Sequence, residues 1–91
     1  MHDVRDNPER NRYELFVDGR LLGIAEYRRT GDVMVLPHTV IQAPERGNGW
    51  GEVLVRAALD DIRRQGYRIV PQCWFVAEFV DLNPQYADLV A

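Results

Sequence analysis

The stretch RGNGWG at residues 46–51 decides how the rest of the chain is interpreted. Its three alternating glycines expose backbone N–H groups, and a helical pattern follows at once. The first four N–H groups of a helix have no intrahelical acceptor, and the helix dipole favours negative charge there. A loop of this kind holds a pyrophosphate through its backbone, so it predicts a site for a phosphate-bearing cofactor. The alternative is a glycine-rich turn that only starts a helix.

Two familiar phosphate-binding loops do not match this stretch. The dinucleotide-binding fingerprint has the spacing G-x-G-x-x-G after the first strand of a β-α-β unit. Here the spacing is G-x-G-x-G, and the loop follows a hairpin pattern. The nucleoside-triphosphate loop ends in Gly-Lys followed by Ser or Thr, and no such sequence follows here. The sequence therefore indicates neither of these two nucleotide-binding folds.

The chain before the glycine loop carries three strand patterns. Apolar residues predict strands at 13–17, 21–28 and 33–41, and Asp18-Gly19 is a strong hairpin turn between the first two. The third pattern is apolar on both faces, which is typical of a central strand. Pro37 lies within it and has no N–H for a ladder hydrogen bond, so it predicts a bulge or a splay there.

A long helix and two short elements follow the loop. Apolar residues at helical spacing predict a helix over 49–65, and Gly66 is a natural residue for its C-terminal cap. A strand at 68–71 follows, and residues 74–80 fit a strand by propensity or a helix by spacing, of which we favour the short helix. The third strand, the helix and the fourth strand form a crossover, which should be right-handed and parallel. The prediction is an α/β (α+β) fold, with a mostly antiparallel sheet, one long helix and a short C-terminal helix.

Length and composition set the limits of this fold. The chain has 91 residues, of which 46% are hydrophobic, enough for one compact domain spanning 1–91. Residues 1–11 are polar and are expected to be a lead-in, and residues 87–91 are expected to be a tail.

Charge, cysteine content and hydropathy narrow the partners. A net charge of −3 argues against broad nucleic-acid binding, which normally needs a basic surface. The single cysteine, Cys73, rules out a disulfide framework and suits a reducing compartment. No leader pattern is visible at the start, and no apolar run reaches the roughly 20 residues of a membrane span. We expect a soluble cytoplasmic protein without nucleic-acid or membrane partners.

Two side chains could carry chemistry near the loop. His38 is a side chain of the type that could take a proton from an amine, although a histidine bonded to a backbone carbonyl is the alternative. Cys73 could form an acyl thioester, or it could be a buried structural thiol. His2, His38 and Cys73 have no metal-ligand spacing, so no metal site is predicted.

Four motifs resemble one family of enzymes. The pattern Arg46-x-x-Gly49-x-Gly51 resembles the Q/R-x-x-G-x-G/A signature of the Gcn5-related N-acetyltransferases. His38-Thr39, Val70-Pro71-x-Cys73 and Asn83-Pro84-x-Tyr86 resemble motifs of its short, stand-alone, YjdJ-like branch in the same order. The resemblance covers about residues 13–86, which is nearly the whole chain.

The resemblance implies a minimal acyl-CoA N-acyltransferase fold that uses acetyl-CoA. In the family, backbone N–H groups of the loop and of the helix start hold the pyrophosphate of coenzyme A. A splay near residues 38–41 admits the pantetheine arm, and His38 and Cys73 are the implied catalytic pair. The implied cofactor-binding residues are Val40, Ile41, Arg46, Gly47, Asn48, Gly49, Trp50 and Gly51. Trp50 and Trp74 are expected to be wall or core residues, and Tyr86 could protonate the departing thiolate.

The chain departs from the branch pattern at two positions. Val40 stands where the branch has a glutamate, and Asn83 stands where it has a histidine. Loss of the carboxylate removes a candidate general base or a group that orients His38. The first hypothesis is transfer of an acetyl group to an amine, including an amine of a protein. The alternative is a non-catalytic module that binds coenzyme A or another protein.

Overall fold

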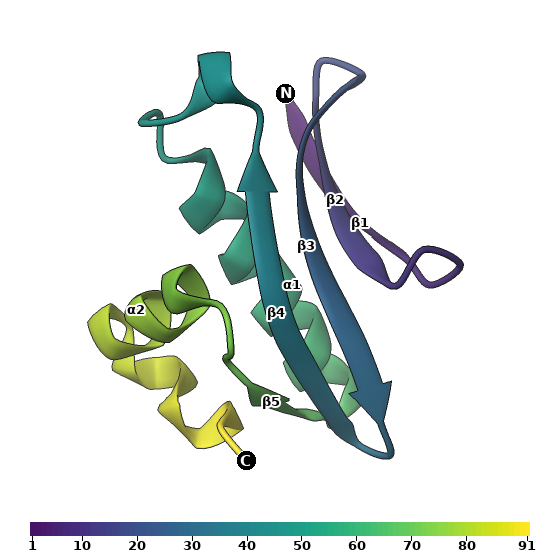
Figure 1. Cartoon of the computed structure of the whole chain (residues 1–91), viewed down its shortest axis with the longest axis vertical. Helices are drawn as coiled ribbons and strands as arrows, with labels where there is room; N and C mark the ends of the chain where they lie inside the picture. Colours follow the sequence, from purple (N-terminus) through teal and green to yellow (C-terminus); the bar gives the residue numbers. More distant parts are fainter.

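Five strands form one sheet, and helices flank it (Figure 1). The computed structural model describes all residues from 1 to 91. The sheet has the order β1-β2-β3-β4-β5; all neighbours are antiparallel except β4 and β5, which are parallel. The elements are β1 (His2–Asn7), β2 (Arg12–Val17), β3 (Arg20–Thr30), β4 (Val33–Ile41), η1 (Ala43–Glu45), α1 (Trp50–Gln65), β5 (Arg68–Val70), α2 (Trp74–Leu82) and η2 (Pro84–Leu89). The predicted α+β fold is confirmed.

The long helix α1 builds the core against one face of the sheet. Its buried side chains are Leu54, Val55, Ala58, Leu59 and Ile62, and α1 packs against β1, β2, β3 and β4. The spacing of these residues places them on one stripe, which is why an amphipathic segment folds here. Gly66 ends the helix in the left-handed conformation, with φ +81°, as the glycine cap predicts. None of the helices is both long enough and apolar enough to cross a membrane.

The opposite face of the sheet carries no helix. In Figure 1, α1 lies behind the sheet, α2 lies to one side, and nothing lies in front of β3 and β4. The polar cross-strand partners Arg12, Glu26 and His38 lie on this face, which we call the open face. Val40 follows His38 on the same face and is 40% exposed. A single helix layer therefore leaves one side of the sheet accessible to large molecules.

Both ends of the chain differ from the prediction. The expected polar lead-in is instead strand β1, whose inward-facing Val4 pairs with Leu15. The expected tail contains the end of η2, where Leu89 is buried and Val90 forms a bridge to Ile69. An edge strand needs only one apolar face, so β1 has too few hydrophobic residues for its pattern to be recognised. The predictions of a polar lead-in and of a tail are therefore wrong.

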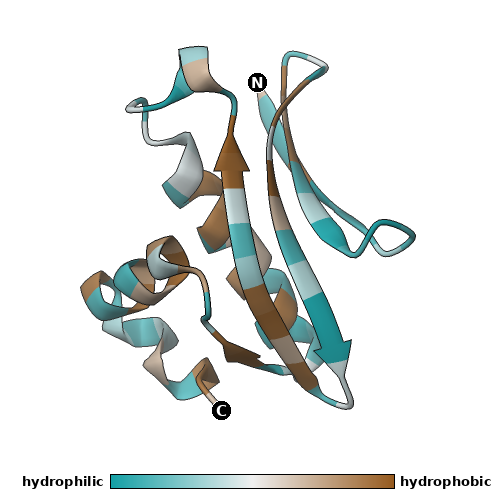
Figure 2. Cartoon of the chain, viewed as in Figure 1, coloured by the Kyte–Doolittle hydropathy of each residue, from teal (hydrophilic) through white to brown (hydrophobic).

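A bulge in β4 changes which residues face the helices. Glu26 is paired with His38, and Arg28 with Val35, so two residues of β4 oppose one of β3. The extra residue lies at Leu36–Pro37, where the missing N–H of Pro37 predicted an irregularity. Before the bulge the even-numbered Met34 is buried, whereas after it the odd-numbered residues 39 and 41 face the helices. Figure 2 shows the apolar first half of β4, a more polar stretch and then its apolar end.

The pairing of β4 with β5 also stops at this place. The last parallel pair is Val35 with Val70, after which the chain turns away, and Cys73 N–H donates to Leu36 O at 2.8 Å. From Pro37 to Ile41 the outer edge of β4 has no strand beside it. The predicted splay is therefore present, and the start of α2 lies beside this part of β4 (Figure 1).

Deleting residues 2–7 tests whether β1 is structural. The deletion removes the strand and also Asp6, whose Oδ1 accepts a hydrogen bond from the partly buried Tyr27 hydroxyl at 2.6 Å. An unsatisfied buried hydroxyl alone costs about 1–3 kcal/mol, so the free energy of unfolding should fall by at least that amount. Urea denaturation measures it. An unchanged midpoint and slope would show that these residues are a lead-in after all.

Candidate functional site

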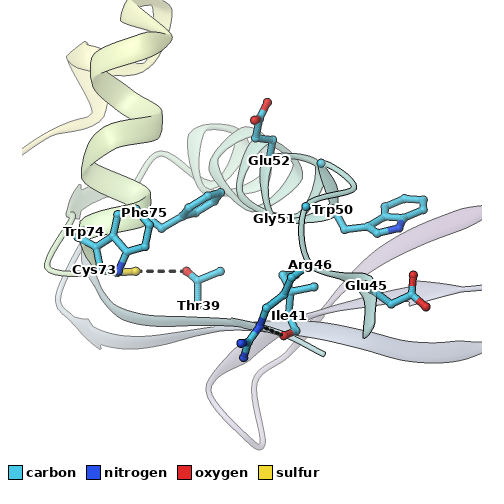
Figure 3. Close-up of a pocket in the computed structure, with 12 residues that line it drawn as sticks. Thr39, Ile41, Glu45, Arg46, Trp50, Gly51, Glu52, Cys73, Trp74 and Phe75 are labelled. Atoms are coloured by element: carbon cyan, nitrogen blue, oxygen red, sulfur yellow. Dashed lines mark hydrogen bonds between the residues drawn. The ribbon is translucent and has the colours of Figure 1, made fainter. Parts of the chain in front are cut away.

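A cavity of about 440 Å³ opens between the end of β4, the glycine loop and the start of α2 (Figure 3). Glu45 at the end of η1 and the first turn of α1 complete its walls. The lining residues are Thr39, Ile41, Glu45, Arg46, Gly47, Gly49, Trp50, Gly51, Glu52, Cys73, Trp74 and Phe75. The structure thus brings Cys73 and most of the predicted loop residues together, although they are distant in the sequence. His38, Val40 and Asn48 are not among the lining residues.

The glycine loop presents unpaired backbone donors to the cavity. Gly47 and Gly49 have φ values of +87° and +81°, which side chains rarely tolerate. The first helical hydrogen bond runs from Val53 N–H to Gly49 O, and no side chain caps the helix. The N–H groups of residues 50–52 therefore have no intrahelical acceptor, and the dipole of the 16-residue helix adds positive potential. These are the donors that an anion needs.

One arginine and two glutamates border the loop. Arg46 donates its Nε–H to Ile41 O at 3.1 Å, which holds the guanidinium at the cavity wall while its other N–H groups stay accessible. Glu45 lies 3.6 Å from Arg20, so its charge is partly compensated. Figure 3 shows the Glu52 carboxylate directed away from Thr39 and Cys73. The cation at the cavity wall is therefore Arg46.

Gly51 allows α2 to approach the start of α1. A Cβ atom on Gly51 would lie 2.8 Å from the end of the Phe75 ring, closer than such atoms come. Phe75 packs edge-to-face with Trp74, which is 73% exposed at the mouth of the cavity. Trp50 is half-buried and contacts His2 with ring centroids 5.6 Å apart. Both tryptophans and Phe75 therefore form walls, as the sequence suggested for Trp50 and Trp74.

Cys73 and Thr39 meet in the cavity beside the splay. The Cys73 thiol is 8% exposed and donates to Thr39 Oγ1 at 3.6 Å (Figure 3). Cys73 also occupies the N-cap position of α2. The sequence indicated Thr39 only as part of the His38-Thr39 motif, not as a cavity residue. The one signal that could have placed it in the cavity is Pro37, because a bulge there reverses the inward and outward positions of β4.

His38 does not form a pair with Cys73. Its exposed side chain lies on the open face, as does Val40, while Thr39 between them faces the cavity. The resemblance implied that His38 and Cys73 act together, and the bulge is the physical reason why they point to different faces. Any role of His38 must therefore be exerted from the open face.

Tyr86 lies outside the cavity. Its buried hydroxyl donates to Asp60 Oδ1 at 2.7 Å, and its ring packs on Phe79 with centroids 5.6 Å apart. Burial and the Asp60 carboxylate raise the pKa of Tyr86. Nearby, Asn83 Oδ1 accepts a hydrogen bond from Arg56 at 3.2 Å. The hypothesis that Tyr86 protonates a thiolate is not supported, because this cluster fastens the C-terminal segment to α1.

The fold and site define a class: a small α+β domain with a glycine loop at a helix start and a splayed parallel strand pair. The chain matches a family model described as GCN5-related N-acetyl-transferase over residues 12–89 and therefore belongs to that family. It is 35% identical to Protein NATD1 of Bos taurus over 52 residues, which are 57% of this chain and 46% of that relative. The chain thus spans about half the length of this curated relative.

Two solved structures share the fold. One is a GCN5-like putative N-acetyltransferase from Staphylococcus aureus, with a TM-score of 0.66 and 16% identity over 98% of this chain and 87% of that chain. The other is the ribosomal-protein-S18-alanine N-acetyltransferase from Escherichia coli, with a TM-score of 0.65 and 15% identity over 79% of this chain and 50% of that chain. At these identities the likeness concerns the fold alone.

Replacing Tyr86 with Phe separates structure from chemistry. The substitution removes the hydrogen bond to Asp60 and keeps the ring, so we expect a loss of about 1 kcal/mol in the free energy of unfolding. Affinity for coenzyme A and any transfer rate should stay unchanged after correction for the folded fraction. Denaturant unfolding and calorimetric titration measure the two quantities. A drop in rate with full stability would restore a chemical role to Tyr86.

Proposed function

We propose that this domain binds acetyl-CoA and transfers its acetyl group to an amine, with a protein as the acceptor that the open face suits. The observation that carries the proposal is the set of unpaired N–H groups at residues 50–52, beside Arg46 and at the rim of a cavity. A pyrophosphate is the anion that suits this cradle, since backbone donors and the helix dipole act on it together. Family membership supports acetyl-CoA as its source.

The splay supplies a place for the pantetheine arm. Gln42 N–H donates to Leu22 O, so the alternation of an antiparallel ladder directs the N–H and C=O groups of Thr39 and Ile41 away from β3. Both N–H groups and the Thr39 C=O are free on this edge of β4 and can bond an extended amide chain as a further strand would, while the Ile41 C=O already accepts from Arg46. An arm that follows this edge from the loop leads toward Cys73 and Thr39.

The residues around the splay divide the chemistry between the two faces. When bound, acetyl-CoA supplies an activated thioester, from which an amine takes the acetyl group and releases the thiol. On the cavity side, Cys73 and Thr39 line the expected thioester position. On the open face, His38 is exposed and can accept a proton from an incoming amine. The absence of a helix over this face suits a large acceptor such as a protein N-terminus or a lysine.

A second candidate is a module that binds coenzyme A without catalysis. The observation that favours it is Val40, which lies on the open face beside His38 and carries no carboxylate. Both candidates require the cradle, and they differ only in transfer. Release of free thiol in the presence of an amine acceptor distinguishes them.

The Gly49→Glu variant tests the cradle. A Cβ at Gly49 meets nothing within 4 Å, so the side chain has room although the positive φ strains the backbone, and its carboxylate would repel an anion at this site. We expect calorimetric titration to detect coenzyme A binding to the native chain. Binding to the variant should be at least about a hundredfold weaker, which corresponds to about 2.8 kcal/mol of binding free energy.

The matched control for this variant is Gly31→Glu. Gly31 also has a positive φ, +61°, with nothing within 4 Å, but lies in the β3–β4 turn at the opposite end of the sheet (Figure 1). It imposes the same charge and similar backbone strain, so it should bind coenzyme A like the native chain. If the native chain does not bind at millimolar ligand, or if both variants lose binding equally, the cradle is not an anion site.

The Cys73→Ala variant distinguishes direct transfer from an acyl-enzyme. The Cys73 thiol donates a hydrogen bond to Thr39 and has no cationic side chain as a partner. We therefore expect the amine to attack the thioester directly, and Cys73→Ala to retain a rate within about tenfold of the native chain. Thr39→Val, which removes only the hydroxyl, is the companion variant. A loss beyond about a thousandfold in Cys73→Ala, with binding retained, would instead identify Cys73 as a nucleophile.

A further inference from the structure

We infer that Glu26 is a positioning residue for His38, and that it supplies from β3 the carboxylate that Val40 does not supply from β4. The inference rests on the proposed function, in which His38 receives the proton of the acceptor amine. It assigns a role to a residue outside all four family-like motifs.

The strand register places the two side chains next to each other. Glu26 and His38 are direct cross-strand partners in the antiparallel pair of β3 and β4, and both lie on the open face. Directly opposite residues on one face have Cβ atoms about 4.5–5.5 Å apart, within reach of a carboxylate and an imidazole. Glu26 is half-buried and His38 is exposed, so the carboxylate is the more restrained of the two groups.

The neighbours of the pair leave the Glu26 carboxylate available. On β2 its other cross-strand partner, Arg12, directs Nε–H to Glu14 at 2.8 Å. This hydrogen bond is the main cause that lowers the pKa of Glu14, so the Glu14 carboxylate stays charged and paired with Arg12. Along β3, Arg28 follows on the same face, opposite Val35 on β4.

The remaining neighbours on the face are either apolar or remote. One pair along, Ile24 opposes Val40, so a wholly apolar pair shields one side of Glu26 and His38. On β5, Arg68 is paired with Val33 near the start of β4, on the far side of the bulge from His38.

This arrangement fits the ordinary chemistry of a histidine base. A carboxylate that accepts a hydrogen bond from one ring nitrogen fixes the tautomer, so that the other nitrogen is free to take a proton. In the branch pattern a glutamate at position 40 would lie on the same strand and face as His38. Here Glu26 supplies the carboxylate to the same face from β3, one cross-strand pair along from Val40.

The test uses the full chain with acetyl-CoA and a peptide that carries a free N-terminus and a lysine. Glu26→Gln should lower kcat at least tenfold and leave the KM for acetyl-CoA unchanged, because His38 loses the carboxylate that orients its ring. Glu9→Gln, in the exposed turn between β1 and β2, makes the same change of charge away from Arg12, Glu26 and His38; it is the matched control and should leave the rate unchanged.

A second readout does not depend on activity. The chain has only two histidines, so nitrogen NMR of the imidazole rings, assigned with His38→Asn, reports the His38 tautomer directly. The native chain should show one dominant tautomer that Glu26→Gln redistributes, while Glu9→Gln retains it. An unchanged tautomer, or an active enzyme whose kcat Glu26→Gln does not alter, overturns the inference alone. A native chain that binds coenzyme A but acetylates no amine overturns the transfer proposal and the role of Glu26 within it.

Discussion

The end of pairing between β4 and β5 is the constraint on which the rest of the site depends. Val35 is the last residue of β4 with a partner on β5, and the bulge at Pro37 follows immediately. Without this interruption β4 would be a continuous central strand with no free edge groups. Because it is interrupted, one edge of β4 is available between the glycine loop and α2, and the cavity forms beside it.

The bulge also separates the functional side chains into two sets. Thr39 and Ile41 face the cavity, while His38 and Val40 face away from it. A cofactor held on the helix side and an acceptor arriving at the uncovered face can therefore meet across the splay. With one helix layer and a cavity of about 440 Å³, the domain has the parts to hold an extended arm but nothing that encloses an acceptor. Under the proposed function, these features favour a protein amine over a small metabolite as the acceptor.

Local features of the sequence predicted much of this fold, and long-range features did not follow from it. The glycine loop, α1, its cap at Gly66 and strands β2 to β5 were recognisable because each is encoded by neighbouring residues. Strand β1 and the docked C-terminal segment were missed because their few apolar residues, such as Val4 and Leu89, acquire meaning only from tertiary partners. The same limit applies to the site: Pro37 indicated an irregularity, but not that it would bring Thr39 to the thiol of Cys73 and turn His38 away. The roles of the loop residues in binding remain predictions.

The most direct test of the account is an amide NMR titration of the full chain with coenzyme A. The account predicts that the largest shifts fall on two groups of backbone N–H signals, those of residues 47–52 at the start of α1 and those of Thr39 and Ile41 on the free edge of β4. Amides in the β3–β4 turn, around Gly31, should not move. Shifts that avoid the glycine loop, or that appear only on the open face of the sheet, would contradict the claim that the helix start holds the pyrophosphate and that the splay holds the pantetheine arm.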